Sequence, residues 1–135
     1  MATTSSDARE ALGMLSKALR DVHRALVNTA KKEYEREWGP VSEGGQLLQL
    51  LTRHPQFDWL HHLSELMVII DELMDEETVS EADRCAVFAQ TKSLIAPSET
   101  DSSDFSRRYI TLLQHDPILV MAHAHVQRIL ASRPA

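Results

Sequence analysis

The chain has 135 residues, of which 43% are apolar and 25% are charged, and its formal net charge at pH 7 is -6. A chain of this length has the size of one domain and can bury enough apolar surface to fold without disulfides or a structural metal. Leu (17) and Ala (14) outnumber Val and Ile (14 together), and there are only 4 Gly and 5 Pro, so the composition favours helices over a turn-rich β-fold.

The cysteine content and the apolar runs exclude further classes of protein. Cys85 is the only cysteine, which rules out a disulfide framework and a cysteine-rich metal site. The longest apolar runs, Leu66–Ile70 and Ile118–Ala122, are too short to span a membrane, and Met1–Glu10 lacks the apolar segment of a signal peptide. We therefore expect a cytoplasmic protein that has no membrane partner.

The charges are distributed unevenly along the chain. Residues 57–104 carry 12 Asp or Glu side chains but only 2 Lys or Arg. Because nucleic acid binding depends mainly on neutralising phosphates with basic side chains, this acidic central third predicts no nucleic acid partner.

The first predicted element is a long helix that runs from Asp7 to Trp38, after a disordered tail at residues 1–6. Its apolar positions recur every three or four residues, which places them on one side of a helix. Gly39 and Pro40 supply a left-handed residue and then one that cannot extend the helix, so the helix should end near Trp38. The residues of the stripe are Leu12, Leu15, Leu19, Val22, Leu26, Ala30 and Tyr34.

After a loop at residues 39–45, the sequence predicts a short helix at 46–53 that is broken at His54 and Pro55. A longer helix follows, in which Phe57 and Trp59 should pack on a neighbouring helix. The apolar residues around Leu66–Ile70 cover nearly all sides of this helix, so we expect it at the centre of the bundle.

Two cap signals mark the later helices. Ser80 followed by Asp83 resembles a capping box and begins a helix that should run to Ile95. After a polar loop at 98–104 comes a helix that starts near Phe105, and Asp116-Pro117 then begins a last helix through Leu130, with residues 132–135 frayed. The sequence therefore predicts an all-α protein: residues 1–135 form a single-domain helical bundle of five to six helices.

Histidines and carboxylates are the only candidates for a metal site. Asp58, His61 and Glu65 share one helix face, and His23 or His123 could complete the set from another helix. The spacing argues against it, because the chain has no Glu-x-x-His and no His-x-x-x-His pair. The main prediction is therefore no metal ligand, with these five residues kept as candidates.

The acidic run at residues 71–77 lies at the end of a predicted helix. It does not match a calcium loop, because Glu76 stands where the required glycine would be. Carboxylates at a helix C-terminus oppose the helix dipole, so either basic residues of another helix or a partner should face them. We predict an interaction surface formed by Asp71, Glu72, Asp75, Glu76 and Glu77.

The sequence predicts no catalytic residue, no cofactor-binding residue and no cofactor. Cys85 falls inside a helix, and no Gly-x-Ser-x-Gly elbow or glycine-rich phosphate loop is present. His54 and His115 each precede a proline at the end of a helix, where a partly protonated ring would cap the negative end of the dipole.

Three segments resemble a group of small helical bacterial proteins that have no assigned activity. They are His54–Leu73, which begins His-Pro-Gln-Phe-Asp-Trp, then Phe105–Ile110 (Phe-Ser-Arg-Arg-Tyr-Ile) and Leu113–Pro117 (Leu-Gln-His-Asp-Pro). The resemblance covers residues 15–130 and implies a bacterial, cytoplasmic, all-helical single domain. It brings no activity, cofactor or catalytic residue with it.

Together these patterns predict a non-catalytic module that binds an unidentified protein partner or a second copy of itself. The long first helix and the acidic run are the surfaces that support this prediction. The alternative is a metal-binding bundle similar in architecture to hemerythrin-like proteins.

Overall fold

A computed structural model of the chain describes residues 5–41, 45–96 and 104–132. These residues form six α-helices and one 3-10 helix and contain no strand, which confirms the predicted all-α class. The elements are α1 (Ser5–Trp38), α2 (Gly45–Arg53), η1 (Pro55–Leu60), α3 (His61–Asp75), α4 (Glu81–Ile95), α5 (Asp104–His115) and α6 (Pro117–Ser132).

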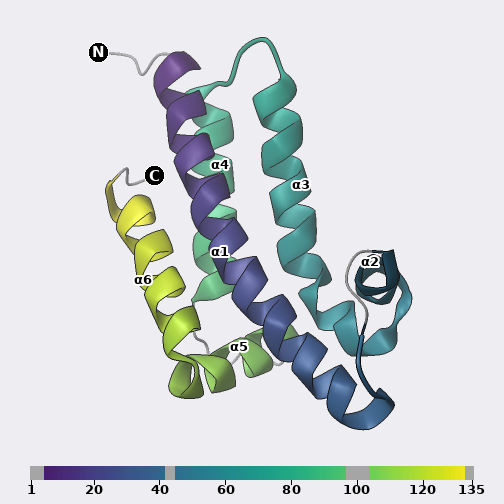
Figure 1. The fold of residues 1–135 in the computed structure, drawn as a ribbon. Coiled ribbons are helices and arrows are strands. Elements are labelled where there is room, and N and C mark those ends of the chain that lie inside the picture. The colour runs from purple at the N-terminus through teal and green to yellow at the C-terminus, as the bar shows by residue number, and fades with distance from the viewer. Residues whose placement is uncertain (1–4, 42–44, 97–103, 133–135) are drawn as a thin grey trace.

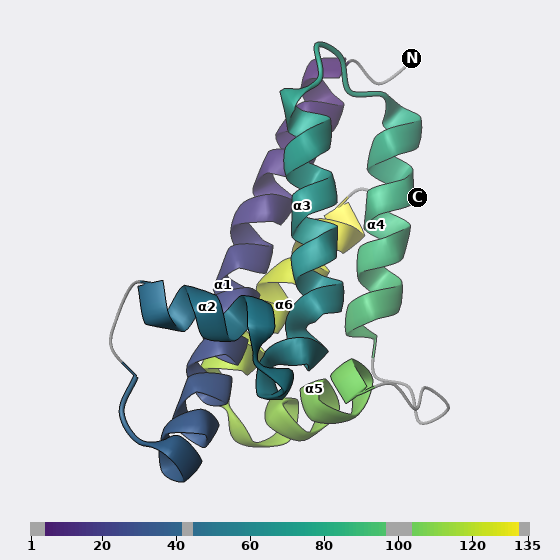
Figure 2. The same cartoon turned by 90° about the vertical axis from the view of Figure 1, so that its right-hand side faces the viewer.

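The bundle is built around α1. Figure 1 shows this helix crossing the whole molecule, with α3 and α6 on either side of it and α4 behind. Helices α3, α4 and α6 all pack on α1, and α5 joins α4 to α6 at the end of the bundle opposite the α3–α4 connection. The short helix α2 stands off the bundle and packs mainly on η1, as the turned view in Figure 2 also shows.

The long first helix follows from its apolar stripe and its terminal glycine. Its 34 residues span about 51 Å at 1.5 Å per residue. It ends at Trp38 as predicted, because Gly39 adopts a φ of 91° and its N–H donates to the carbonyl of Glu35 at 3.0 Å. The helix begins at Ser5, two residues earlier than predicted, and residues 1–4 of the expected tail lie outside the described residues.

The core is formed mainly by the predicted stripe of α1 together with one face each of α3 and α6. Leu63 and Ile70 of α3 and Val126 of α6 are fully buried against it, and Phe57 and Trp59 of η1 are buried as predicted. The fully buried leucines of the stripe are Leu12, Leu15, Leu19 and Leu26.

The prediction that the helix containing Leu66–Ile70 lies at the centre was wrong. Helix α3 packs mainly on α1, α4 and η1, and His61 at its start also contacts the carbonyl of Leu51 in α2 at 3.4 Å. The side of α3 that carries Val68 and Ile69 faces outward. Val68 is consequently 53% exposed and Ile69 37% exposed. Successive helical residues are separated by 100°, so five apolar residues in a row must point in all directions, and an outer helix leaves some of them uncovered.

The region around His54 also differs from the prediction. The chain after Pro55 first forms the 3-10 helix η1 and becomes α-helical only at His61. His54 is the N-cap of η1, and its Nδ1 accepts a hydrogen bond from the backbone N–H of Gln56 at 3.2 Å. The ring therefore uses an unprotonated nitrogen to begin the next element, rather than a charge to close α2. His115 is the last residue of α5 and is exposed.

The two predicted cap signals are confirmed. The side chain of Ser80 accepts from the N–H of Asp83 at 3.0 Å, and the N–H of Ser80 donates to the Asp83 carboxylate at 3.3 Å, which closes a capping box at the start of α4. Asp116 accepts from the N–H groups of Ile118 and Leu119 at 3.0 and 3.3 Å and so caps α6. Ser132, expected in a frayed end, is the last residue of α6, and residues 133–135 lie outside the described residues.

Removing the α4 cap should destabilise the protein measurably. Ser80→Ala removes the acceptor for the Asp83 N–H, and such a loss lowers the free energy of unfolding by about 1 kcal/mol. Urea denaturation followed by circular dichroism measures this difference. Ser93→Ala, at an exposed position inside the same helix, is the matched control and should change stability by no more than about 0.5 kcal/mol. Equal values for the two variants would contradict the cap.

Candidate functional site

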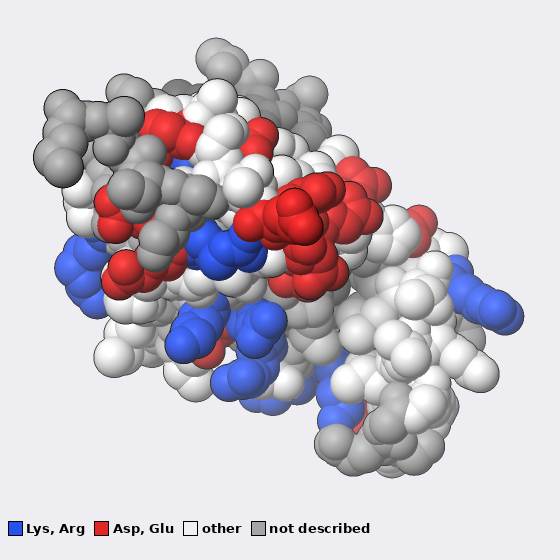
Figure 3. Space-filling view, turned by 90° about the horizontal axis from the view of Figure 1, so that it is seen from above, with Lys and Arg blue, Asp and Glu red and all other residues white. Residues whose placement is uncertain are grey.

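The predicted acidic surface lies at the C-terminal end of α3 and in the turn that follows. All five residues of the prediction, Asp71, Glu72, Asp75, Glu76 and Glu77, are exposed. Figure 3 views the molecule from this end and shows acidic side chains gathered in a patch, with basic side chains along one border. Within the described residues, none of these five carboxylates forms an ion pair with Lys or Arg.

The helix end beneath this patch is held by a basic residue of α1. The Arg9 guanidinium donates to the main-chain carbonyl of Met74, to that of Glu76 at 2.6 Å and to that of Glu77 at 3.2 Å. The carbonyl of Met74 lies in the last turn of α3 and that of Glu76 at its C-cap, so the cation stands at the negative end of the helix, where it is favourable. One basic residue of another helix therefore faces the acidic run, but it binds the backbone and leaves the carboxylates free.

One side of the acidic run faces α1. A groove of about 450 Å³ separates the two helices, and the basic residues Lys17 and Arg20 line it opposite Asp71 and Asp75. The positive charges of α1 lower the electrostatic cost of these two carboxylates without a direct ion pair. The basic residues therefore compensate the α1 side of α3, and its outer side stays acidic.

The outer side of α3 combines acidic and apolar side chains, and we call it the α3 outer face. Val68 and Ile69 are exposed there between Glu65 and Glu72, which lie one turn before and one turn after them. These residues line a shallow hollow of about 450 Å³. The α3 outer face consists of His61, Ser64, Glu65, Val68, Ile69 and Glu72.

The candidate metal ligands are not brought together. Asp58, His61 and Glu65 are all exposed, although His61 and Glu65 do lie on one face of α3 as the spacing predicted. His23 of α1 hydrogen-bonds Ser64 at 3.4 Å, and His123 of α6 is buried in another part of the core. Among the described residues, no group of three or more His, Cys, Asp or Glu side chains has the geometry to hold a metal ion.

Both inward-facing histidines have structural partners instead. Nδ1 of His123 is 2.8 Å from the hydroxyl of Tyr109, and both side chains are buried. Burial lowers the pKa of His123 and of His23, and burial raises the pKa of Tyr109. Burial therefore favours the protonated Tyr109 hydroxyl and the neutral His123 ring, which share this hydrogen bond.

Sequence analysis missed two features of the site. Arg9 was not identified, because its carbonyl partners lie 65–68 positions further along the chain and no local pattern connects them. The exposure of Val68 and Ile69 was missed because an apolar run shows which residues avoid water but not which of them a neighbouring helix covers.

The chain has no match among protein-family models, curated proteins or solved structures. The resemblance to small bacterial helical proteins therefore stays a prediction. Along the described part of the chain, no helix combines the length and the apolar character needed to cross a membrane.

Proposed function

We propose that this protein is a non-catalytic cytoplasmic interaction module whose α3 outer face binds a basic amphipathic helix of a protein partner. The observation that carries the proposal is the exposure of two adjacent β-branched side chains, Val68 and Ile69, on a face whose charged side chains are all acidic. The single cysteine supports a reducing compartment.

The apolar part of this face supplies the driving force for binding. Val68 and Ile69 are 53% and 37% exposed, so a partner helix that covers them removes apolar surface from water. The shallow hollow around them has the form that accepts side chains of a helix laid across it. Isolated exposed apolar residues are common, whereas here two of them are contiguous and lie in one hollow.

The charges of the face select the kind of partner. Glu65 and Glu72 flank the apolar pair, and Glu76 and Glu77 continue the negative charge beyond the end of α3. Basic residues on the polar side of a partner helix would complement these carboxylates and accelerate association. A symmetric dimer through this face would instead set acidic side chains against acidic side chains, which favours a basic partner over a second copy.

The face is also held in place before binding. Helix α3 is anchored by Leu63, Leu66 and Ile70, which are all fully buried, and its C-terminal end is fixed by Arg9. A preformed surface loses little conformational entropy when the partner arrives.

Binding of a synthetic probe tests the proposal. The probe is a fluorescein-labelled amphipathic helix as long as α3, with Leu on one side and Lys or Arg on the other, measured by fluorescence polarisation. We expect Val68→Ser/Ile69→Ser to weaken binding at least about tenfold, equivalent to about 1.4 kcal/mol, because the variant loses two apolar contacts. Glu65→Lys/Glu72→Lys should weaken it as well, with a larger effect at low salt than at high salt.

Matched variants separate this face from the rest of the surface. Ile118→Ser/Val120→Ser removes the same two side-chain types from an exposed part of α6, and Asp21→Lys/Glu37→Lys makes the same change in net charge on α1. Both controls should bind the probe like the wild type. Equal losses in a control and its matched variant would overturn the proposal. So would a dimer detected by size exclusion and abolished by Val68→Ser/Ile69→Ser, because a second copy would then cover the face.

A further inference from the structure

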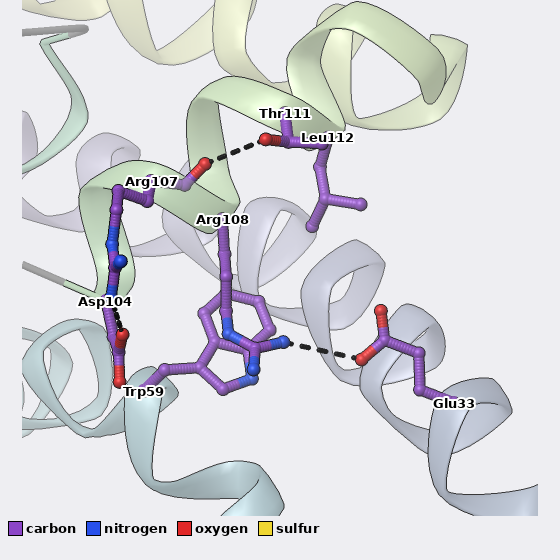
Figure 4. Close-up of a pocket in the computed structure, with 7 residues that line it drawn as sticks. All are labelled: Glu33, Trp59, Asp104, Arg107, Arg108, Thr111 and Leu112. Carbon is purple, nitrogen blue, oxygen red and sulfur yellow. Dashed lines mark hydrogen bonds and ion pairs between the residues drawn. The ribbon is translucent and has the colours of Figure 1, made fainter. Parts of the chain in front are cut away.

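A second hollow lies at the opposite end of the bundle, where α5 crosses η1 and α1. Its volume is about 390 Å³, and Figure 4 shows its lining side chains converging from the three elements. It shares no residue with the α3 outer face, so an inference drawn from it is independent of the function proposed above. The lining residues are Glu33, Trp59, Asp104, Arg107, Arg108, Thr111 and Leu112.

Trp59 brings a buried hydrogen-bond donor to this hollow. Only 5% of the residue is exposed, and its ring packs against Phe105 with the ring centres 6.2 Å apart. Its indole N–H is buried and has no hydrogen-bond partner among the described residues. A buried donor without an acceptor is unfavourable and uncommon in folded proteins, so this N–H favours an acceptor placed beside it.

Arg108 adds further donors beside the indole. Its guanidinium lies 5.4 Å from the centre of the Trp59 ring, and Figure 4 shows it stacked over this ring and pointing toward Glu33. The ion pair with Glu33 is 3.5 Å long, which is longer than a direct N–H to O hydrogen bond. The neighbouring Arg107 is already paired with Asp104 within α5. Arg108 is therefore the basic group whose donors are least used.

The hollow thus has more donors than acceptors. A guanidinium offers five N–H groups in a planar fork, and the Trp59 N–H adds another beside it. The carboxylate of Glu33 accepts from Arg108 in one long contact, and the carboxylate of Asp104 is paired with Arg107. Two oxygens on one small group would match the guanidinium fork and supply the missing acceptor for the indole.

We propose that this hollow binds a small oxyanion, a carboxylate or phosphate group, which Arg108 holds through its guanidinium and Trp59 through its indole N–H. The Arg108 side chain is 46% exposed and can swing off the ring to admit the ligand to the indole. Glu33 competes for the same guanidinium, so its carboxylate limits affinity in the empty site.

The fluorescence of Trp59 reports binding directly. Trp38→Phe leaves Trp59 as the only tryptophan and serves as the parent protein, because Trp38 is exposed and is not among the residues that line this hollow. Sodium phosphate and sodium malonate are titrated separately at constant ionic strength, with sodium chloride as the control salt. We expect a saturable change in Trp59 emission with at least one of the two oxyanions and no saturable change with chloride.

Three variants in this parent make the test specific. Arg108→Gln should raise the dissociation constant at least tenfold, and Glu33→Gln should lower it severalfold because the competing carboxylate is gone. Arg24→Gln, which removes an exposed arginine elsewhere on α1, should leave binding unchanged. Circular dichroism establishes that each variant is folded. The indole N–H resonance of Trp59, followed by two-dimensional NMR, should shift during the same titration.

The outcomes separate the possible ligands. Saturation with phosphate alone assigns the site to phosphate groups, and saturation with malonate alone assigns it to carboxylates. The proposal is overturned if neither oxyanion gives a saturable change, if Arg108→Gln binds as tightly as the parent, or if Arg24→Gln weakens binding equally.

Discussion

Leu19→Ala is expected to lower the free energy of unfolding by about 3 kcal/mol, the largest loss that we predict for a single substitution. Leu19 is fully buried in the middle of α1, the helix on which α3, α4 and α6 all pack. Truncating its side chain removes apolar contacts and leaves a cavity that three neighbouring helices cannot all collapse to fill. Urea denaturation followed by circular dichroism gives the difference from the wild type.

Met14→Ala is the control on the same helix. Met14 is 48% exposed, so its truncation should cost less than about 1 kcal/mol. Both substitutions introduce alanine, which has the highest helix propensity, and the comparison therefore isolates burial from helix formation. If the two variants lost equal stability, α1 would not be the central helix of the bundle.

The second large effect concerns the buried hydrogen bond between Tyr109 and His123. Tyr109→Phe removes the hydroxyl that lies 2.8 Å from Nδ1 of His123 and leaves this nitrogen buried without a partner. We expect a loss of about 2 kcal/mol at neutral pH, because an unsatisfied buried polar group costs more than an average hydrogen bond contributes. Thermal and urea unfolding of the variant at pH 7.5 measure this loss.

The same pair makes stability depend on pH in a defined direction. Burial lowers the pKa of His123 below its ordinary value of 6.5, so the unfolded chain binds a proton more readily than the folded one. The contribution of His123 to the free energy of unfolding is then fully present above pH 6.5, and it is lost as the pH falls through the lowered pKa of the folded state. His23 contributes in the same direction, because burial lowers its pKa as well.

Single variants separate the two histidines. His123→Asn and His23→Asn each remove one titrating ring, so each should flatten part of the decline in unfolding free energy below pH 6.5. Unfolding free energies measured between pH 7.5 and 5 give these slopes. His125→Asn, at an exposed position on the same helix as His123, is the control and should keep the wild-type slope. A wild-type slope in His123→Asn would contradict the buried, neutral state of His123.

Local signals in the sequence predicted most helix boundaries correctly. The Ser80–Asp83 capping box, the Asp116 cap and the left-handed Gly39 each act within four residues of the boundary that they set. Such interactions form between neighbours in the chain, so their residue types are enough to identify them.

Features that depend on tertiary arrangement were not predictable in this way. Val68 and Ile69 are apolar, but only the placement of α3 at the outside of the bundle leaves them exposed. Arg9 and the end of α3 are far apart in the sequence. Tyr109 and His123 lie on different helices, so no pattern within one helix connects them. Helical periodicity gives the face that a residue occupies, whereas function depends on what lies opposite that face.

The candidate site was therefore predicted only in part. The exposure of Asp71, Glu72 and the other acidic residues followed from their charge, since such residues are rarely buried unpaired. The exposure of the apolar pair, Val68 and Ile69, was identified only from the structure.

The proposed binding of a basic amphipathic helix to the α3 outer face can be mapped residue by residue. The most direct measurement is a two-dimensional amide NMR titration of the uniformly labelled protein with the unlabelled probe helix. We predict that the largest shifts fall on residues 61–77, centred on Val68 and Ile69, and that the exposed apolar residues Ile118 and Met121 of α6 do not shift. Shifts spread over all acidic surfaces, or centred on α6, would contradict the claim.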